Sequence, residues 1–399
     1  MAEVETREGG KLPQVAVLFT HYAPYHVDRV EAAARRLEGR ARVLAVETAD
    51  SSREYAWEPA SGFRHAQHVT LFPDRIYEEI GQLERLQAYA RHMRHCDLVL
   101  SGVPWSAPDI VALSWRWRAR GRRIYAMTDS KFDDKPRNLL REQVKARLLA
   151  GFSGAVVAGL RQRDYLRFLG FGERPILPGY DTLSVARIRR LAEGAERLAW
   201  EERPFTFVGR FVGKKNLPTL LEGYARYRAQ AGEGARRMLL VGDGPQAGEL
   251  RALTDRLGIA GGVEFTGRLT SQGVARRLSH ALALCLFSVE EQWGLVVNEA
   301  VALGIPAIVS PAVGARDALV RGGETGHVVE PQSPASIARA MLATAGDRAR
   351  WQALAAATLE REWLADAERF ADAVELLIDP QAEEARSNVE RFWELCESG

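Results

Sequence analysis

The feature that most constrains the fold is an alternation of short apolar runs with helical stretches, which recurs along the whole chain. The runs are dense in Val, Leu and Ile, which is typical of strands buried on both faces of a sheet. Helices between such strands imply right-handed crossovers and hence parallel sheets. In the first half we expect strands at Val15–Thr20, Arg42–Glu47, Asp97–Gly102, Arg123–Met127 and Gly154–Gly159. In the second half we expect them at Phe205–Gly209, Arg237–Gly242, Val263–Thr266, Ala283–Phe287 and Ala307–Ser310.

A chain of 399 residues exceeds what one hydrophobic core usually serves, so the pattern predicts two doubly wound α/β domains. We place the first domain at 1–183 and the second at 204–379. Residues 184–203, charged and rich in Ala, are the predicted linker. Residues 380–399 have a helical pattern, which either packs on the second domain or crosses back to the first.

The charge balance excludes some partners. A formal net charge of +2 is too balanced for nucleic acid to be the main ligand, although it suits a small anion. The three cysteines lie far apart, which argues against a metal or redox motif and for a reducing compartment. The polar N-terminus lacks the apolar segment of a signal peptide, and there is no run of 18 apolar residues. We therefore expect a cytoplasmic protein.

Two cations follow the first strand of the second half. That strand ends at Gly209, where a glycine lets a ligand approach the backbone, and Arg210 and Lys215 come next. A diphosphate requires charge-assisted donors of this kind. The helix expected from about Leu217 would add the positive end of its dipole. On its own, a surface loop with solvated bases explains the segment equally well.

Glycine turns also follow the next two strands. Gly242 and Gly244 come after one of them, and Gly267 and Arg268 come after the strand that carries Phe265. Ligands of open parallel sheets bind beyond the carboxyl ends of the strands, so these turns are expected to line one crevice. Each turn alone is a weak signal.

Two acids flank an expected helix start. Glu291 precedes and Glu299 follows the point near Gly294 where a helix opens. The free N–H groups of Gly294, Leu295 and Val296 would point at an anion. Spacing alone favours a helix with two solvated acids.

Taken in order, these motifs resemble the retaining glycosyltransferases of family 4. The resemblance rests on Gly209-Arg210 with Lys215, on Gly242-Asp243-Gly244, and on Glu291 to Glu299 with Trp293-Gly294 between them. It covers Phe205 to about Gly346 closely and the first half loosely. Loops of the first half are similar to a branch of polysaccharide-cluster transferases. The resemblance implies the GT-B fold, in which two Rossmann-like domains face each other across a cleft.

The resemblance also implies residue roles. Arg210 and Lys215 would neutralise the donor diphosphate, Glu291 would hold hydroxyls of the donor sugar, and Glu299 would bind the ribose. The strand around Val263–Gly267 would contact the base. The catalytic set is thus Arg210, Lys215 and Glu291. The implied donor-binding set is Gly209, Gly242, Gly244, Phe265, Gly267, Arg268, Trp293, Gly294, Leu295, Val296 and Glu299.

The activity implied is transfer, with retention, of a hexose-type sugar from a nucleoside-diphosphate sugar to a hydroxyl acceptor, which is a glycan, a lipid-linked compound or a small molecule. No cofactor or metal is expected, because the cations and the helix start would already neutralise the diphosphate. An Asp-x-Asp pair that could hold a metal ion is also missing, since Asp133 and Asp134 are adjacent. The donor base, the sugar and the acceptor stay open. The alternatives are a nucleotide-sugar epimerase and a non-catalytic nucleotide-sugar-binding protein of the same fold.

The first half departs from the family pattern. The loop after its first strand lacks the usual pair of glycines, and Thr128 stands where many relatives have histidine. The acceptor-side candidates are His21, His26, Asp129 and Lys131, for which a structural or solvated role is an equally good explanation.

Two further patterns are ambiguous. The pairs His65/His68 and His92/His95 lack a third ligand, so we favour solvated positions over a metal site. Bases and tryptophans mix around Trp115–Arg123, and bases recur over Arg137–Arg147. Such segments suit peripheral contact with an acidic membrane at its cytoplasmic face. We favour a basic helix end with its tryptophans packed inward over this membrane contact.

Overall fold

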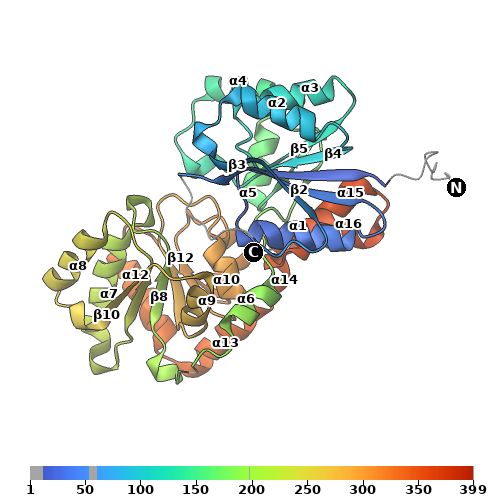
Figure 1. Ribbon diagram of the computed structural model, residues 1–399. Coiled ribbons are helices and arrows are strands. Elements are labelled where there is room, and N and C mark those ends of the chain that lie inside the picture. The colour runs from blue at the N-terminus through green and yellow to red at the C-terminus, as the bar shows by residue number, and fades with distance from the viewer. Residues whose placement is uncertain (1–11, 54–60, 197, 399) are drawn as a thin grey trace.

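The computed structural model describes residues 12–53, 61–196 and 198–398. They form two α/β domains, each built on one parallel sheet with helices packed against it (Figure 1). The predicted fold class, two Rossmann-like domains, is confirmed.

The sheet of the first domain has the order β3-β2-β1-β4-β5-β6-β7. Its strands are β1 (Gln14–Phe19), β2 (Arg42–Ser51), β3 (Gln67–Ile76), β4 (Leu98–Ser101), β5 (Arg123–Thr128), β6 (Gly154–Val157) and β7 (Ile176–Leu177). The helices between the strands are α1 (Pro24–Arg36), α2 (Gln82–His92), α3 (Pro108–Arg118), α4 (Leu139–Leu148) and α5 (Leu160–Phe168). All five predicted strands are present. The sequence analysis missed β3 and β7, which are edge strands without a long apolar run.

The sheet of the second domain has the order β10-β9-β8-β11-β12-β13. Its strands are β8 (Phe205–Val208), β9 (Met238–Val241), β10 (Val263–Gly267), β11 (Ala283–Leu286), β12 (Ala307–Val309) and β13 (Gly326–Val328). The helices of this domain are α7 (Leu217–Ala231), α8 (Ala247–Arg256), α9 (Ser271–Ser279), α10 (Leu295–Ala302), α11 (Arg316–Leu319), α12 (Pro334–Ala345), α13 (Arg348–Leu359) and α14 (Glu362–Ala365). The strand order reverses between β8 and β11, and open α/β sheets bind ligands at such a point.

The chain passes between the domains twice. The predicted linker contains α6 (Val185–Ala192), and Leu183 just before it forms a parallel bridge with Asp366. After Asp366 the chain returns to the first domain, where α15 (Glu368–Ile378) packs against α1. Phe370 and Val374 of α15 belong to the core of the first domain. We had assigned residues up to 379 to the second domain, so the return begins earlier than the helical pattern suggested.

The last helix, α16 (Glu383–Glu397), lies where the two domains meet. Its Phe392 and Cys396 join the core of the second domain, whereas Trp393 packs at the edge of both cores. Arg163 of α5 stacks on Trp393 and pairs with Glu397 at 2.7 Å. Within the described part of the chain, every helix is too short or too polar to cross a bilayer.

Candidate functional site

Three glycine turns at the carboxyl ends of neighbouring strands lie against one another. Gly209 follows β8, Gly242 follows β9 and Gly267 ends β10. The N–H of Gly242 donates to the carbonyl of Gly267, and the N–H of Gly209 donates to the carbonyl of Val241, both at 3.0 Å. The predicted convergence of these turns is what the structure shows.

Gly242 is held by close backbone packing. Its φ is +133°, and a Cβ built on it would lie 2.0 Å from the carbonyl oxygen of Gly209. We expect Gly242→Ala to destabilise the protein by about 2–3 kcal/mol, because the two turns must move apart, and to weaken ligand binding at this edge. Thermal unfolding and nucleotide titration measure the two effects.

Gly248 in α8 supplies the matched control. Among the described residues, a Cβ there would meet open space out to 4 Å, so Gly248→Ala should be neutral or stabilise the helix by about 0.5–1 kcal/mol. Equal behaviour of the two variants would contradict the packing argument.

Lys215 and Glu291 form the centre of the candidate site. Lys215 ends a helical turn (Gly213–Lys215) after β8, and Glu291 follows β11, the adjacent strand. The ammonium of Lys215 donates to Oε2 of Glu291, and the hydroxyl of Ser288 donates to the same oxygen at 2.9 Å. The two side chains are 15% and 12% exposed. A mostly buried ion pair therefore stands at the switch point of the sheet.

The helix α10 begins beside this pair. Its N-cap is Gly294 with a φ of +98°, and a Cβ there would lie 3.5 Å from Cγ of Glu291. Leu295 and Val296 form the first turn, whose N–H groups lack partners within the helix. The positive end of the α10 dipole thus lies close to the Lys215–Glu291 pair.

The other predicted donor residues differ in how far they are buried. Arg210 and Arg268 are exposed. Phe265 is half-buried, with Arg251 stacked on its ring at 4.4 Å from the centroid. A Cβ on Gly244 would lie 2.6 Å from the carbonyl oxygen of Phe211, so this glycine lets two loops pack closely.

Trp293 lies in the contact between the domains. Its indole is 4% exposed and donates to Oδ1 of Asn298 at 2.9 Å. A Cβ on Gly159, at the start of α5, would lie 3.0 Å from the indole ring. The side chain therefore packs against the first domain, and a donor contact by Trp293 would have to use its main chain.

Glu299 lies on α10 and is partly buried. Burial raises the pKa of its carboxyl from 4.5 to about 7, while nearby Arg187 lowers this pKa and Asp28 raises it. Arg187 and Asp28 themselves pair at 2.7 Å and join α6 to α1. The predicted ribose ligand is therefore close to the segment that links the domains.

This raised pKa makes stability depend on pH. The folded protein holds the Glu299 proton more tightly than the unfolded chain does, so ionising the group opposes folding. The free energy of unfolding should fall as pH rises from 4.5 to about 7 and be unaffected by this group above that range. Glu299→Gln cannot ionise, so its Tm relative to the wild type should rise through the same window. A Tm difference that is constant from pH 5 to pH 8 would contradict this expectation.

A buried charge cluster of the first domain faces the same region. Arg29 of α1 is 1% exposed, donates to the carbonyl of Tyr25 at 3.1 Å, and lies 3.7 Å from Asp181. The pKa of Asp129, which follows β5, is raised to about 6: burial is the largest cause, Asp134 and Glu291 also raise this pKa, and Arg29 lowers it. Burial and Asp129 also raise the pKa of Asp181. Asp129 is thus within electrostatic reach of Glu291 across the domain boundary.

The other acceptor-side candidates are packed into the first domain. Nδ1 of His26 accepts from the N–H of Ala23 at 2.9 Å, and the ring stacks on Phe19 with centroids 4.0 Å apart. His21 is 4% exposed. Lys131 is buried and donates to Asp134 at 2.7 Å, so its side chain is not solvated. The contacts of His26 and Lys131 agree with a structural role, and the acceptor-side assignment of these residues stays a prediction.

Three residues that the sequence analysis did not single out join the two domains near Glu291. Gln162 donates to the carbonyl of Asp129 at 3.2 Å and to that of Gln292 at 3.1 Å. Arg161 donates to Asp133 at 2.8 Å and to the carbonyl of Val313 at 2.7 Å. Asn298 donates to the carbonyl of Asp181 at 2.9 Å. Amides and an arginine without a motif gave no signal in the sequence.

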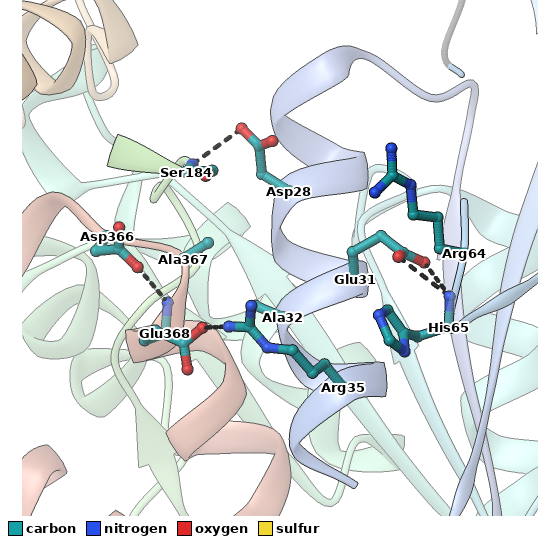
Figure 2. Close-up of a pocket in the computed structure, with 10 residues that line it drawn as sticks. All are labelled: Asp28, Glu31, Ala32, Arg35, Arg64, His65, Ser184, Asp366, Ala367 and Glu368. Atoms are coloured by element: carbon teal, nitrogen blue, oxygen red, sulfur yellow. Dashed lines mark hydrogen bonds and ion pairs between the residues drawn. The ribbon is translucent and has the colours of Figure 1, made fainter. Parts of the chain in front are cut away.

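A polar hollow of about 220 Å³ lies between α1 and the start of α15 (Figure 2). Several of its charged side chains have partners: Glu31 accepts from the backbone N–H of His65 at 3.1 Å, and Arg35 contacts Glu368. The hollow borders both interdomain crossings, at Ser184 and Asp366, and its lining includes none of the predicted donor residues. Over 12–53, 61–196 and 198–398, no group of three or more His, Cys, Asp or Glu side chains is placed to hold a metal ion.

The two sheets and their arrangement define the GT-B fold. Sucrose-phosphate synthase from Thermosynechococcus elongatus superposes with a TM-score of 0.69 at 21% identity, covering 92% of this chain and 98% of that chain. Anabaena Alr3699/HepE in complex with UDP and glucose superposes with a TM-score of 0.68 at 15% identity, covering 92% and 100%. At such identities the likeness concerns the fold.

The sequence of the second domain is similar to known glycosyltransferases. Residues 202–347 match the family described as Glycosyl transferases group 1. The GDP-mannose-dependent alpha-(1-6)-phosphatidylinositol monomannoside mannosyltransferase of Mycobacterium tuberculosis is 33% identical over 184 residues, 43% of this chain and 46% of that protein. The D-inositol 3-phosphate glycosyltransferase of Rhodococcus opacus is 32% identical over 160 residues, 39% and 36%. The chain thus spans less than half the length of each of these relatives.

Proposed function

We propose that this protein is a retaining glycosyltransferase of family 4 that moves a hexose-type sugar from a nucleoside-diphosphate sugar to a hydroxyl acceptor. The observation that carries the proposal is the Lys215–Glu291 pair, which stands at the switch point of the second sheet beside the start of α10. The match of residues 202–347 to a glycosyl transferase family supports it. So does the GT-B fold, which one neighbour uses to bind UDP-glucose.

The proposed donor site supplies positive charge where the leaving group needs it. Lys215, Arg210 and the N–H groups at the start of α10 would contact the diphosphate, on which negative charge grows as the glycosidic bond breaks. Before the donor binds, Glu291 holds Lys215 in place. When the diphosphate takes over Lys215, the carboxylate of Glu291 becomes able to accept hydrogen bonds from sugar hydroxyls.

The proposed reaction needs no enzymic nucleophile. The bond between the anomeric carbon and the phosphate oxygen breaks, and the acceptor oxygen forms its bond to that carbon from the same face. The proton of the acceptor hydroxyl passes to the leaving phosphate. Because protein cations and a helix end neutralise that phosphate, we propose that transfer is independent of a metal ion and that EDTA leaves the rate unchanged.

One series of measurements tests the function. Thermal shifts with UDP-, GDP- and ADP-sugars identify the donor, since a ligand that binds the folded state raises Tm. With that donor, nucleoside-diphosphate release should depend on an added hydroxyl acceptor, and NMR of the product should show the anomeric configuration of the donor. Interconversion of the donor sugar without release of the diphosphate would instead identify an epimerase. Binding without any turnover over an acceptor panel would identify a non-catalytic protein.

A further inference from the structure

One face of the first domain exposes large apolar side chains among bases. It is formed by α3 and α4, and we call it the α3–α4 face. Leu140 is 73% exposed, Val144 54%, Leu148 47% and Trp115 45%. Leu139 is exposed as well. Single exposed apolar residues are ordinary on protein surfaces, whereas a contiguous group of them is typical of an interaction site.

The apolar residues form a stripe. Leu140, Val144 and Leu148 are spaced four apart on α4 and therefore lie on one side of the helix. Trp115 of α3 joins them, because its indole N–H donates to the carbonyl of Leu148 at 3.0 Å. The opposite side of α4 faces the protein through Glu142, which is buried and accepts from the hydroxyl of Tyr165 at 2.6 Å. The stripe is therefore directed away from the core.

Only bases flank this stripe in the sequence. Residues 110–128 contain no Asp or Glu, and residues 135–163 contain Glu142 alone, which is buried. The exposed bases of the face are Arg116, Arg118, Arg120, Arg141 and Arg147. The face therefore combines an apolar stripe with an uncompensated positive charge.

We propose that the α3–α4 face docks on an anionic lipid bilayer, with the stripe of α4 and Trp115 at the level of the acyl chain boundary and the arginines on lipid phosphates. An interfacial helix on an acidic membrane requires these two properties together. A second copy of this chain fits less well, because two-fold pairing would set the basic face against itself. A nucleic acid would leave the leucine stripe in water.

The position of the face agrees with this assignment. Figure 1 shows α3 and α4 on the side of the first sheet that is turned away from the second domain. A docked first domain would thus leave the donor-site loops of the second domain in water. The docking does not depend on the proposed transfer reaction, and vesicle binding measures it without turnover.

Vesicle cosedimentation with the full chain tests the docking. We expect binding to vesicles of 70% phosphatidylcholine and 30% phosphatidylglycerol, and at least tenfold weaker binding to pure phosphatidylcholine. Each arginine near an anionic surface contributes about fivefold, so Arg141→Gln with Arg147→Gln should weaken binding by about 25-fold. Leu140→Gln with Val144→Gln and Leu148→Gln should weaken it at least as much while leaving Tm and nucleotide affinity unchanged.

Matched variants of the second domain show whether a loss of vesicle binding is specific to the α3–α4 face or follows from any loss of charge or of exposed apolar surface. Arg226 and Arg256 are exposed there, so Arg226→Gln with Arg256→Gln changes the net charge equally. Leu359 is 40% exposed, and Leu359→Gln is the apolar control. No binding to the anionic vesicles at about 100 mM salt would overturn the proposal, as would an equal loss in the control variants. A dimer in light scattering that the α4 variant converts to monomer would assign the face to a second copy instead.

Discussion

Replacing Lys215 with alanine is expected to lower kcat by about 100- to 1000-fold, equivalent to about 3–4 kcal/mol of transition-state stabilisation. The ammonium is the most enclosed cation at the carboxyl ends of β8 and β11, and it already lies against a carboxylate beside the start of α10. A charge held in such a place needs little reorganisation when the leaving diphosphate develops its own charge. Initial rates of nucleoside-diphosphate release under saturating donor measure the effect.

The neighbouring Lys214 is the control for this variant. It is exposed, and its carbonyl rather than its side chain accepts from the N–H of Val289 at 2.9 Å. Lys214→Ala should therefore keep nearly full activity. Lys215→Ala leaves the carboxylate of Glu291 with the Ser288 hydroxyl as its hydrogen-bond donor, so we expect a loss of about 1–3 kcal/mol in stability but a folded protein by circular dichroism. Turnover within threefold of the wild type would refute the assignment of Lys215.

Replacing Glu291 with glutamine should also cost about 100-fold or more in kcat, for a different reason. The amide keeps the shape of the side chain but loses the charge that anchors Lys215 and accepts hydrogen bonds from the donor sugar. Because these contacts concern the sugar, the affinity for the nucleoside diphosphate alone should change by less than about threefold. Calorimetric titration with the diphosphate and with the intact donor separates the two contributions.

The Glu291 prediction has a control and a consistency check. Glu290, its sequence neighbour, has no part in the pair, and Glu290→Gln should be close to wild type. If Lys215 and Glu291 act as one unit, the double variant should be scarcely slower than the slower single variant. Fully additive losses would show that the two residues act independently and would contradict the unit. A loss of affinity for the free diphosphate as large as the loss for the intact donor would contradict the assignment of Glu291 to the sugar.

Most strands were predictable because buried strands consist mainly of apolar residues. A strand covered by helices on both faces is mostly apolar, so β1, β4, β8, β9 and β11 are recognisable as runs rich in Val, Leu or Phe. The edge strand β3 carries Gln67, His68 and Thr70 and is largely open, so it lacks that signal. The strand β7 has two half-buried residues, and β13 (Gly326–Val328) is half-buried and includes His327, whereas the equally short β12 is wholly buried and apolar.

The residue types at the candidate site were also predictable from the sequence, but which of the polar side chains around it are buried or paired was not. Glycines at strand ends and a Lys and a Glu at set positions follow from the sequence, because parallel strands bring their carboxyl ends to one edge. That Lys131 would be buried on Asp134, or that the indole of Trp293 would face Gly159, depends on residues far away in the chain. A polar loop has the same composition whether it is solvated or packed.

The amino-acid sequence was enough to predict the two-domain parallel architecture and the edge of the second sheet at which Lys215 and Glu291 stand. The periodicity of apolar residues and the glycines at strand ends depend on neighbours in the sequence, so they can be recognised from the sequence alone. The sequence does not reveal that Arg161, Gln162 and Asn298 join the two domains, or that Gln162 links the carbonyl of Asp129 to that of Gln292 beside Glu291. Only the tertiary structure decided that α15 returns to α1 and that the leucine stripe of α4 is open to water. The physical reason is that burial, the pairing of charges and the raised pKa values come from neighbours that the fold brings together, and the sequence does not record which neighbours these are.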